Sequence, residues 1–282
     1  MSAATEPEAM VEGAAHAEEG FDAGAIIMHH ILDSHEVEIP FGGGATIPLP
    51  HIELFGFDIS ITRSVVMMWI ASVIVLVVML LAARRAKDPV PRGLRAALEV
   101  LILFIRDDIA RKAIDKKPDR YLGYLLTTFF FILSCNLLGL VPGMNTATGS
   151  ISVTAALAVM AFVMIQGAGI REYGVVGHLK NLVPHGLPLP VVFLIVPVEI
   201  IGMFAKPFAL CIRLFANMTA GHVVIVSFIS LIFILKTAWV ATVSVPFVLF
   251  IDLLELLIAF IQAYIFTMLT ALFIGMSAHP AH

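Results

Sequence analysis

The sequence has few charged residues and few cysteines, and each shortage excludes a class of protein. Only 13% of its 282 residues are charged, 60% are hydrophobic, and the mean hydropathy is +0.98. This composition excludes an ordinary soluble domain and predicts an integral membrane protein. Because Cys135 and Cys211 lie in apolar segments without CxxC spacing, we expect neither a disulfide framework nor a zinc site. We expect no cofactor.

Lysine and arginine are absent from residues 1–62, which argues against a secretory signal and against an organelle transit peptide. Residues 1–60 instead hold 11 of the 21 acidic residues. Five histidines among these acids suggest a metal site, but their spacing matches no zinc pattern, so a solvated acidic extension is favoured. We therefore divide the chain into an extramembrane N-terminal extension over 1–62 and a membrane domain over 63–282. The histidines are His16, His29, His30, His35 and His51.

Basic residues are concentrated in residues 84–120, which hold 11 of the 17 lysines and arginines. The positive-inside rule predicts that this loop is cytoplasmic. Residues 64–83 carry no charge over twenty positions, which is enough to cross a membrane. The N-terminus is therefore expected outside, in the periplasm if the cell is a Gram-negative bacterium.

Four further apolar segments predict an all-α polytopic membrane protein with about five to six membrane helices. Residues 124–143 and 149–166 each have the length of one span. Residues 187–235 and 237–277 are longer, at about 74 and 62 Å if fully helical, against a hydrocarbon core of about 30 Å. Each is either broken at its prolines, such as Pro246, into two short spans, or is one long and strongly tilted helix. Length alone does not choose between these alternatives.

Ionisable residues recur at helical spacing within the first long segment. Glu199, Lys206 and Arg213 follow at intervals of seven, so they line one stripe of a helix, with Asn217 one turn further along. His222 lies nine residues beyond Arg213 and faces the opposite side. An arginine at the centre of a membrane helix costs about 2.5 to 3.5 kcal/mol on insertion scales, so Arg213 calls for a functional reason. Glu199 and Lys206 can equally be snorkelling side chains or a local ion pair.

The second long segment carries two acids and an amide. Glu255 and Gln262 share one helix face, and Asp252 lies one turn before Glu255. Helix packing explains any single polar residue, but an arginine, two carboxylates and a histidine in adjacent apolar segments favour a functional site. Arg213 cannot release its proton and can only act as a fixed charge that stabilises a carboxylate, whereas His222 and the acids can exchange protons. The carboxylate that meets Arg213 need not be in this chain.

Three motifs carry a resemblance to a known family. "KPFALCIRLFANMTAGH" at 206–222, "LELLIAFIQAYIFTMLTALFI" at 254–274 and "NLLGLVPG" at 136–143 resemble subunit a of the F-type ATP synthases. That subunit is the stator protein against which a rotor ring of c subunits turns. The resemblance covers roughly residues 60–277. It implies that the last two helices form a long, strongly tilted hairpin against the ring, and that the chain is a multi-pass protein of the bacterial inner (cytoplasmic) membrane.

The resemblance also implies a role for individual residues. It makes Arg213 the essential stator charge between two aqueous half-channels that conduct protons to and from a c-ring carboxylate. Proton flow is thereby coupled to rotation and ATP synthesis, so the chain is a proton-translocating subunit and not an enzyme on its own. It places Asn217 and Gln262 near the arginine. The implied half-channel residues are His222, Glu255 and Asp252 on the outer side and Glu199 on the cytoplasmic side. The implied partners are the c-subunit ring, the b-subunit peripheral stalk, the other ATP synthase subunits and membrane lipid, and no nucleic acid.

The sequence departs from the family pattern at two places. Many bacterial relatives carry glutamate at the position of His222 and histidine at that of Glu255, so the two types are exchanged here. Either order leaves one carboxylate and one imidazole across the two helices. Gly139 stands where some relatives carry an acid, which leaves the lining of that part of the channel open.

Two other classes of membrane protein fit the sequence less well. A secondary transporter also buries charges at mid-membrane, but it usually shows internal repeats, and we find none between the two halves of the chain. An intramembrane hydrolase needs a nucleophile with a base or an HExxH pair, and the sequence contains neither HExxH nor GxSxG.

Overall fold

The computed structural model describes most of the membrane domain and four short strands before it. The histidines of the N-terminal extension, and Pro142 and Gly143 at the predicted end of the second span, lie outside the described residues. The structure describes residues 36–38, 46–48, 53–54, 57–58, 60–84, 93–115, 117–141, 144, 146–180, 189–235 and 238–278.

The four strands form two antiparallel pairs that the sequence analysis did not expect. Strand β1 (Glu36–Glu38) pairs with β2 (Thr46–Pro48), and β3 (Glu53–Leu54) pairs with β4 (Phe57–Asp58). The short alternations of polar and apolar residues in these strands, as in "EVE" and "TIP", suit such pairs. The all-α prediction therefore holds for the described part of the membrane domain and not for the segment before it.

Five helices of the described chain are long and apolar enough to cross a membrane, which confirms the prediction of a polytopic helical membrane protein. The first three are α3 (Arg63–Arg84), α6 (Asp119–Gly139) and α7 (Ile151–Lys180). Helix α3 matches the predicted first span. The prediction that the third span ends at residue 166 is wrong, because the following stretch has glycines but no proline and the helix continues through it.

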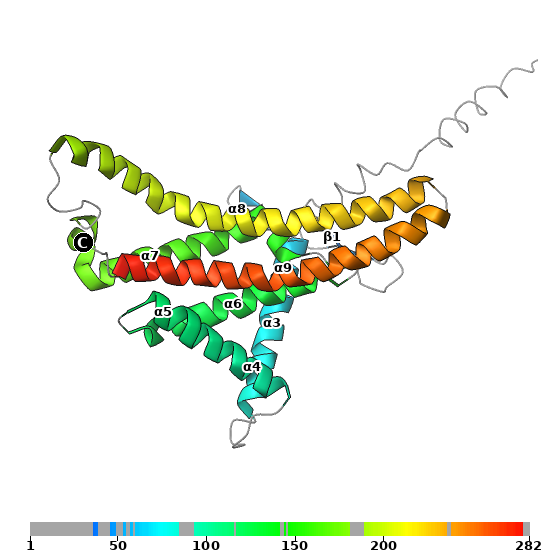
Figure 1. The fold of residues 1–282 in the computed structure, drawn as a ribbon, viewed down its shortest axis with the longest axis horizontal. Helices are drawn as coiled ribbons and strands as arrows, with labels where there is room; N and C mark the ends of the chain where they lie inside the picture. The colour runs from blue at the N-terminus through cyan, green and yellow to red at the C-terminus, as the bar shows by residue number, and fades with distance from the viewer. Residues whose placement is uncertain are drawn as a thin grey trace, which may run out of the picture.

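The two long segments form one helix each, which decides between the alternatives. Helix α8 (Leu189–Leu235) has 47 residues and α9 (Ala238–Ala278) has 41, or about 70 and 62 Å. Both run through internal prolines, Pro197 and Pro207 in α8 and Pro246 in α9, so of the two alternatives that the sequence left open, the unbroken helix is the one observed. Figure 1 shows α8 and α9 side by side, across the direction of α3, as expected of strongly tilted helices.

The basic loop contains a helical segment that packs on the membrane helices. Helix α4 (Leu94–Leu103) continues through a π-helical turn, η2 (Phe104–Ala110), into α5 (Arg111–Ala113). Within η2, Asp107 accepts from Arg106 Nε at 3.0 Å and pairs with Arg111 Nη1 at 2.7 Å. The hydrogen bond from Arg106 lowers the pKa of the Asp107 carboxyl below its usual value. Asp107 is therefore neutralised within the segment.

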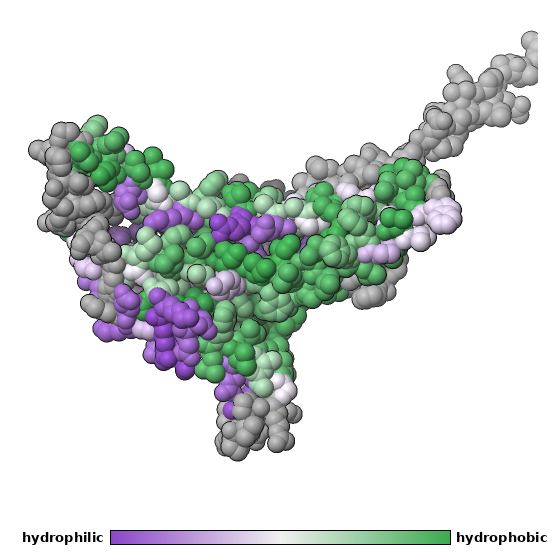
Figure 2. All heavy atoms as spheres, viewed as in Figure 1, coloured by the Kyte–Doolittle hydropathy of each residue, from purple (hydrophilic) through white to green (hydrophobic). Residues whose placement is uncertain are grey.

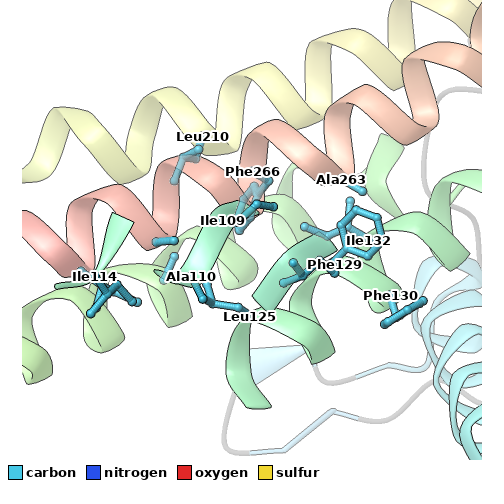
Figure 3. Close-up of a cluster of buried hydrophobic side chains, with 14 of the residues drawn as sticks. Ile109, Ala110, Ile114, Leu125, Phe129, Phe130, Ile132, Leu210, Ala263 and Phe266 are labelled. Atoms are coloured by element: carbon cyan, nitrogen blue, oxygen red, sulfur yellow. The ribbon is translucent and has the colours of Figure 1, made fainter. Parts of the chain in front are cut away.

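One buried apolar cluster joins the basic segment to the membrane helices. Figure 3 shows side chains from η2, α6, α8 and α9 meeting in it. At its edge, a Cβ added to Gly275 of α9 would overlap the carbonyl oxygen of Ala113, so the C-terminal end of α9 lies directly against the basic segment. The labelled members of the cluster are Ile109, Ala110, Ile114, Leu125, Phe129, Phe130, Ile132, Leu210, Ala263 and Phe266.

Candidate ion-translocation site

Arg213 lies on the exposed side of α8. Its neighbours Leu210, Leu214 and Met218 are at most 1% exposed and pack inwards, so the face that they define leaves the arginine pointing outwards. No hydrogen bond or ion pair of the Arg213 side chain exists within the described chain. Figure 2 shows hydrophilic residues gathered along the middle of α8, within a face that is otherwise mostly hydrophobic. A guanidinium placed in this way requires a counter-charge or water from outside the chain.

A hydrogen bond between two amides fixes α8 against α9 one turn from the arginine. Asn217 Nδ2 donates to Gln262 Oε1 at 2.7 Å. Gln262 is 1% exposed, whereas Asn217 lies on the exposed side of α8, so the bond leads from the surface around Arg213 into the space between the helices. The structure thus brings Arg213, Asn217 and Gln262 into one neighbourhood.

Glu255 is a buried carboxylate that lies against Gly221. Its side chain is 3% exposed, and neither carboxylate oxygen has a hydrogen-bond partner within the described residues. A Cβ added to Gly221 would lie 2.5 Å from Oε1, so a side chain there would displace the carboxylate from its present position. His222 follows Gly221 on α8, and Asp252 lies one turn before Glu255 on α9, where it is partly exposed. Three proton-exchanging groups thus lie near one point of the helix pair.

Lys206 and Glu199 lie further towards the start of α8. Lys206 Nζ is 5.3 Å from the ring centroid of Phe273 on α9, a cation–π contact and neither of the two arrangements expected from the sequence. Glu199 is exposed and lies 14 residues before Arg213, about 21 Å along the helix, so the structure does not bring it together with the other predicted residues.

The sequence analysis missed a buried polar network between α6 and α9. Thr148 Oγ1 donates to Asn136 Oδ1 at 2.7 Å, and Asn136 Nδ2 donates to the Ala259 carbonyl at 3.4 Å. A Cβ added to Gly139 would overlap the Thr146 side chain, so this network leaves no room for an acid at position 139. The sequence feature that could have predicted this network is Asn136, an asparagine within an apolar span.

These features define a polytopic membrane protein with ionisable side chains along its two longest helices. The comparisons with known proteins agree: the family model "ATP synthase A chain" matches residues 65–275. ATP synthase subunit a of Chloroherpeton thalassium is 52% identical over 261 residues, which cover 90% of this chain and 77% of that protein. ATP synthase subunit a 2 of Prosthecochloris aestuarii is 53% identical over 279 residues, with 96% and 85% covered.

The chain therefore belongs to the ATP synthase A chain family, which confirms the resemblance seen in its motifs. As a family member it is a membrane component of the ATP synthase, a proton-translocating complex, and it acts with the other subunits and not as a separate enzyme. The family membership applies to the whole chain but assigns no role to any individual residue. Proposals for those roles rest on the geometry of the site.

Proposed function

We propose that this chain provides two aqueous half-channels, separated by Arg213, that lead protons to and from a carboxylate on a rotor ring of c subunits. The observation that carries the proposal is that the outward-facing Arg213 has no counter-ion within the described chain, while the same pair of helices buries the carboxylate of Glu255. A fixed cation on the outer surface suits a carboxylate that arrives on another chain and leaves again.

The entry half-channel is formed by His222, Glu255 and Asp252. The imidazole and the carboxylates take up a proton from the outer side and deliver it to the rotor carboxylate. The neutral acid then moves through lipid at little cost, because it no longer carries a charge. The Asn217–Gln262 bond supports this role by fixing the register of α8 and α9 between the entry residues and the arginine.

At Arg213 the rotor acid loses its proton again. The guanidinium stabilises the ionised carboxylate and thereby favours release of the proton into the exit half-channel, in which Glu199 takes part. The same fixed charge repels protons and prevents direct passage between the half-channels. Each proton that crosses 100 mV supplies about 2.3 kcal/mol, so several must cross for each ATP made.

The proposed topology follows the charge distribution. The basic segment faces the cytoplasm of a bacterial cell, and the extension over 1–62 lies outside, on the periplasmic side of the inner membrane. The membrane domain over 63–282 contacts the c ring through α8 and α9 and the b-subunit peripheral stalk elsewhere.

Arg213→Ala tests this proposal, with Lys206→Ala as a matched control on the same helix. The membranes are inverted vesicles with the assembled complex, and the measured quantity is ATP-driven acidification of the lumen. We expect no acidification with Arg213→Ala and near-normal acidification with Lys206→Ala, because Lys206 already rests on the Phe273 ring. Normal pumping by an assembled Arg213→Ala complex would contradict the proposal.

A further inference from the structure

A second polar cluster lies at the far end of α7, away from the residues discussed above. Helix α7 changes direction at Gly174, whose φ of 70° and ψ of 169° fall outside the helical region and favour glycine. The returning segment brings His178 back onto its own helix, where Nε2 lies 2.8 Å from Gln166 Oε1. A Cβ added to Gly169 would overlap the imidazole ring, so the glycine permits this approach.

The hydrogen bond assigns the roles of the two ring nitrogens. Because the Gln166 carbonyl oxygen can only accept, His178 Nε2 carries the hydrogen and donates. In the neutral ring, Nδ1 therefore keeps a lone pair. The same added Cβ at Gly169 would lie 2.5 Å from Ser277 Oγ of α9, a buried hydroxyl that has no partner within the described residues. The Nδ1 proton acceptor and a hydroxyl that has no partner within the described residues thus both lie close to Gly169.

Along the pair of helices α8 and α9, Arg213 lies between Glu255 and this cluster. Ser277 is 22 residues after Glu255 on α9, about 33 Å along the helix, and Gln262, the level of the arginine, lies between them. Ser277 is also two residues beyond Gly275, which abuts the basic segment. The cluster is therefore at the end of the helix bundle that carries the basic residues.

We propose that His178 is a proton-relay residue of the exit half-channel, an inference that rests on the proposed function. A proton released beside Arg213 passes through water to Nδ1, which becomes protonated while Nε2–H stays bonded to Gln166. The imidazolium then gives the Nδ1 proton to water at the basic end and returns to its neutral form. Ser277 orients the water that meets Nδ1. In the opposite direction of rotation, the same ring takes up protons from the basic side.

Among the described ionisable groups around the turn of α7, His178 is partly buried and the others are exposed. Arg171 and Glu172, which precede the turn on α7, are both exposed, and the α9 group at the cluster is the hydroxyl of Ser277. The returning segment therefore has one exposed side, and its imidazole lies on the side of Gly169 and Ser277, as expected of a group at a channel mouth.

His178→Gln is the decisive variant, because glutamine can still donate to Gln166 but cannot carry a proton. In inverted vesicles with the assembled complex, we expect the initial rate of ATP-driven acidification to fall roughly tenfold. This is less than the roughly 100- to 10,000-fold supplied by a positioned general base, because water also carries protons at a channel mouth. Tyr173→Phe, at an exposed position of the same segment, is the matched control and is expected to leave the rate unchanged.

A second measurement adds imidazole to His178→Ala vesicles. Rescue by imidazole would not occur if His178 had only a packing role. We expect added imidazole to restore a large part of the lost rate. A wild-type rate for His178→Gln, or no effect of imidazole on His178→Ala, would overturn the relay. Arg213→Ala in the same assay separates the two proposals: if it blocks pumping while His178→Gln is normal, only the relay fails, whereas pumping by Arg213→Ala contradicts the half-channel proposal itself.

Discussion

Gly221→Ala is the substitution whose effect the structure predicts most directly. The added methyl would lie 2.5 Å from Glu255 Oε1 and 2.9 Å from Cδ, so the carboxylate has to retreat by about 0.9 Å to reach the 3.4 Å of an ordinary contact. The clashing atoms are the flexible end of a side chain, so it is the carboxylate that moves, while the backbones of α8 and α9 stay in place.

The expected loss is therefore in proton transfer and not in folding. Alanine favours a helix over glycine by about 0.8 to 1.0 kcal/mol, which offsets much of the roughly 1 to 3 kcal/mol that overpacking costs. A misplacement of about 1 Å, by contrast, can slow a reaction on the order of 100-fold. We expect Gly221→Ala to reduce ATP-driven acidification between roughly 10- and 100-fold in a complex that assembles normally.

Two further variants make the measurement specific. Gly202→Ala is the control on the same helix, because nothing lies within 4 Å of its added Cβ, and it should pump normally. Glu255→Asp shortens the side chain by one methylene, so Gly221→Ala combined with Glu255→Asp should pump better than Gly221→Ala alone. Equal rates for Gly221→Ala and Gly202→Ala, or no coupling in the double mutant, would refute the reasoning.

Three other substitutions test the packing of the long helices. Gly275→Ala would drive a methyl into the Ala113 carbonyl, a backbone group that cannot swing aside, so thermal unfolding in detergent should show a loss of at least about 1 to 3 kcal/mol. Asn217→Ala leaves the buried Gln262 amide without its partner, which should cost about 1 to 3 kcal/mol in the same measurement. Gly174→Ala forces a side chain into the left-handed region at about 1 to 2 kcal/mol, and the end of α7 should become more accessible to protease. Unchanged stability of any variant would show that the corresponding contact is not made.

Hydropathy was enough to predict the five membrane helices, and it also predicted the ends of three of them, α3, α8 and α9. The predicted segments 187–235 and 237–277 agree with α8 and α9 within two residues, because long apolar runs have no other stable form in a membrane. The prolines left a break open as an alternative, but a single proline removes one hydrogen bond, which neighbouring packing in a long helix tolerates. Helix α4 was missed because the surplus of basic residues marked its stretch as a loop.

The site was predictable only within each helix. The spacing of Arg213 and Asn217 along the sequence predicted that they share one face of α8, because the geometry of a helix depends only on nearby residues. The contacts of Asn217 with Gln262 and of Gly221 with Glu255 depend on the register between α8 and α9, and no local pattern contains that register. His178 was missed for the same reason, since its position follows from the turn at a single glycine.

One physical argument explains why Arg213 is exposed while Glu255 is buried. A chain that supplied its own counter-ion to Arg213 would satisfy the guanidinium permanently, and an arriving carboxylate would then gain little by ionising beside it. With no partner in the described chain, the guanidinium is most stable when a second chain brings a carboxylate to it. In the proposed mechanism that contact breaks as the rotor moves on, so it is made at the surface. In the proposed mechanism Glu255 exchanges protons with water and needs no such partner, so it can remain buried behind Gly221.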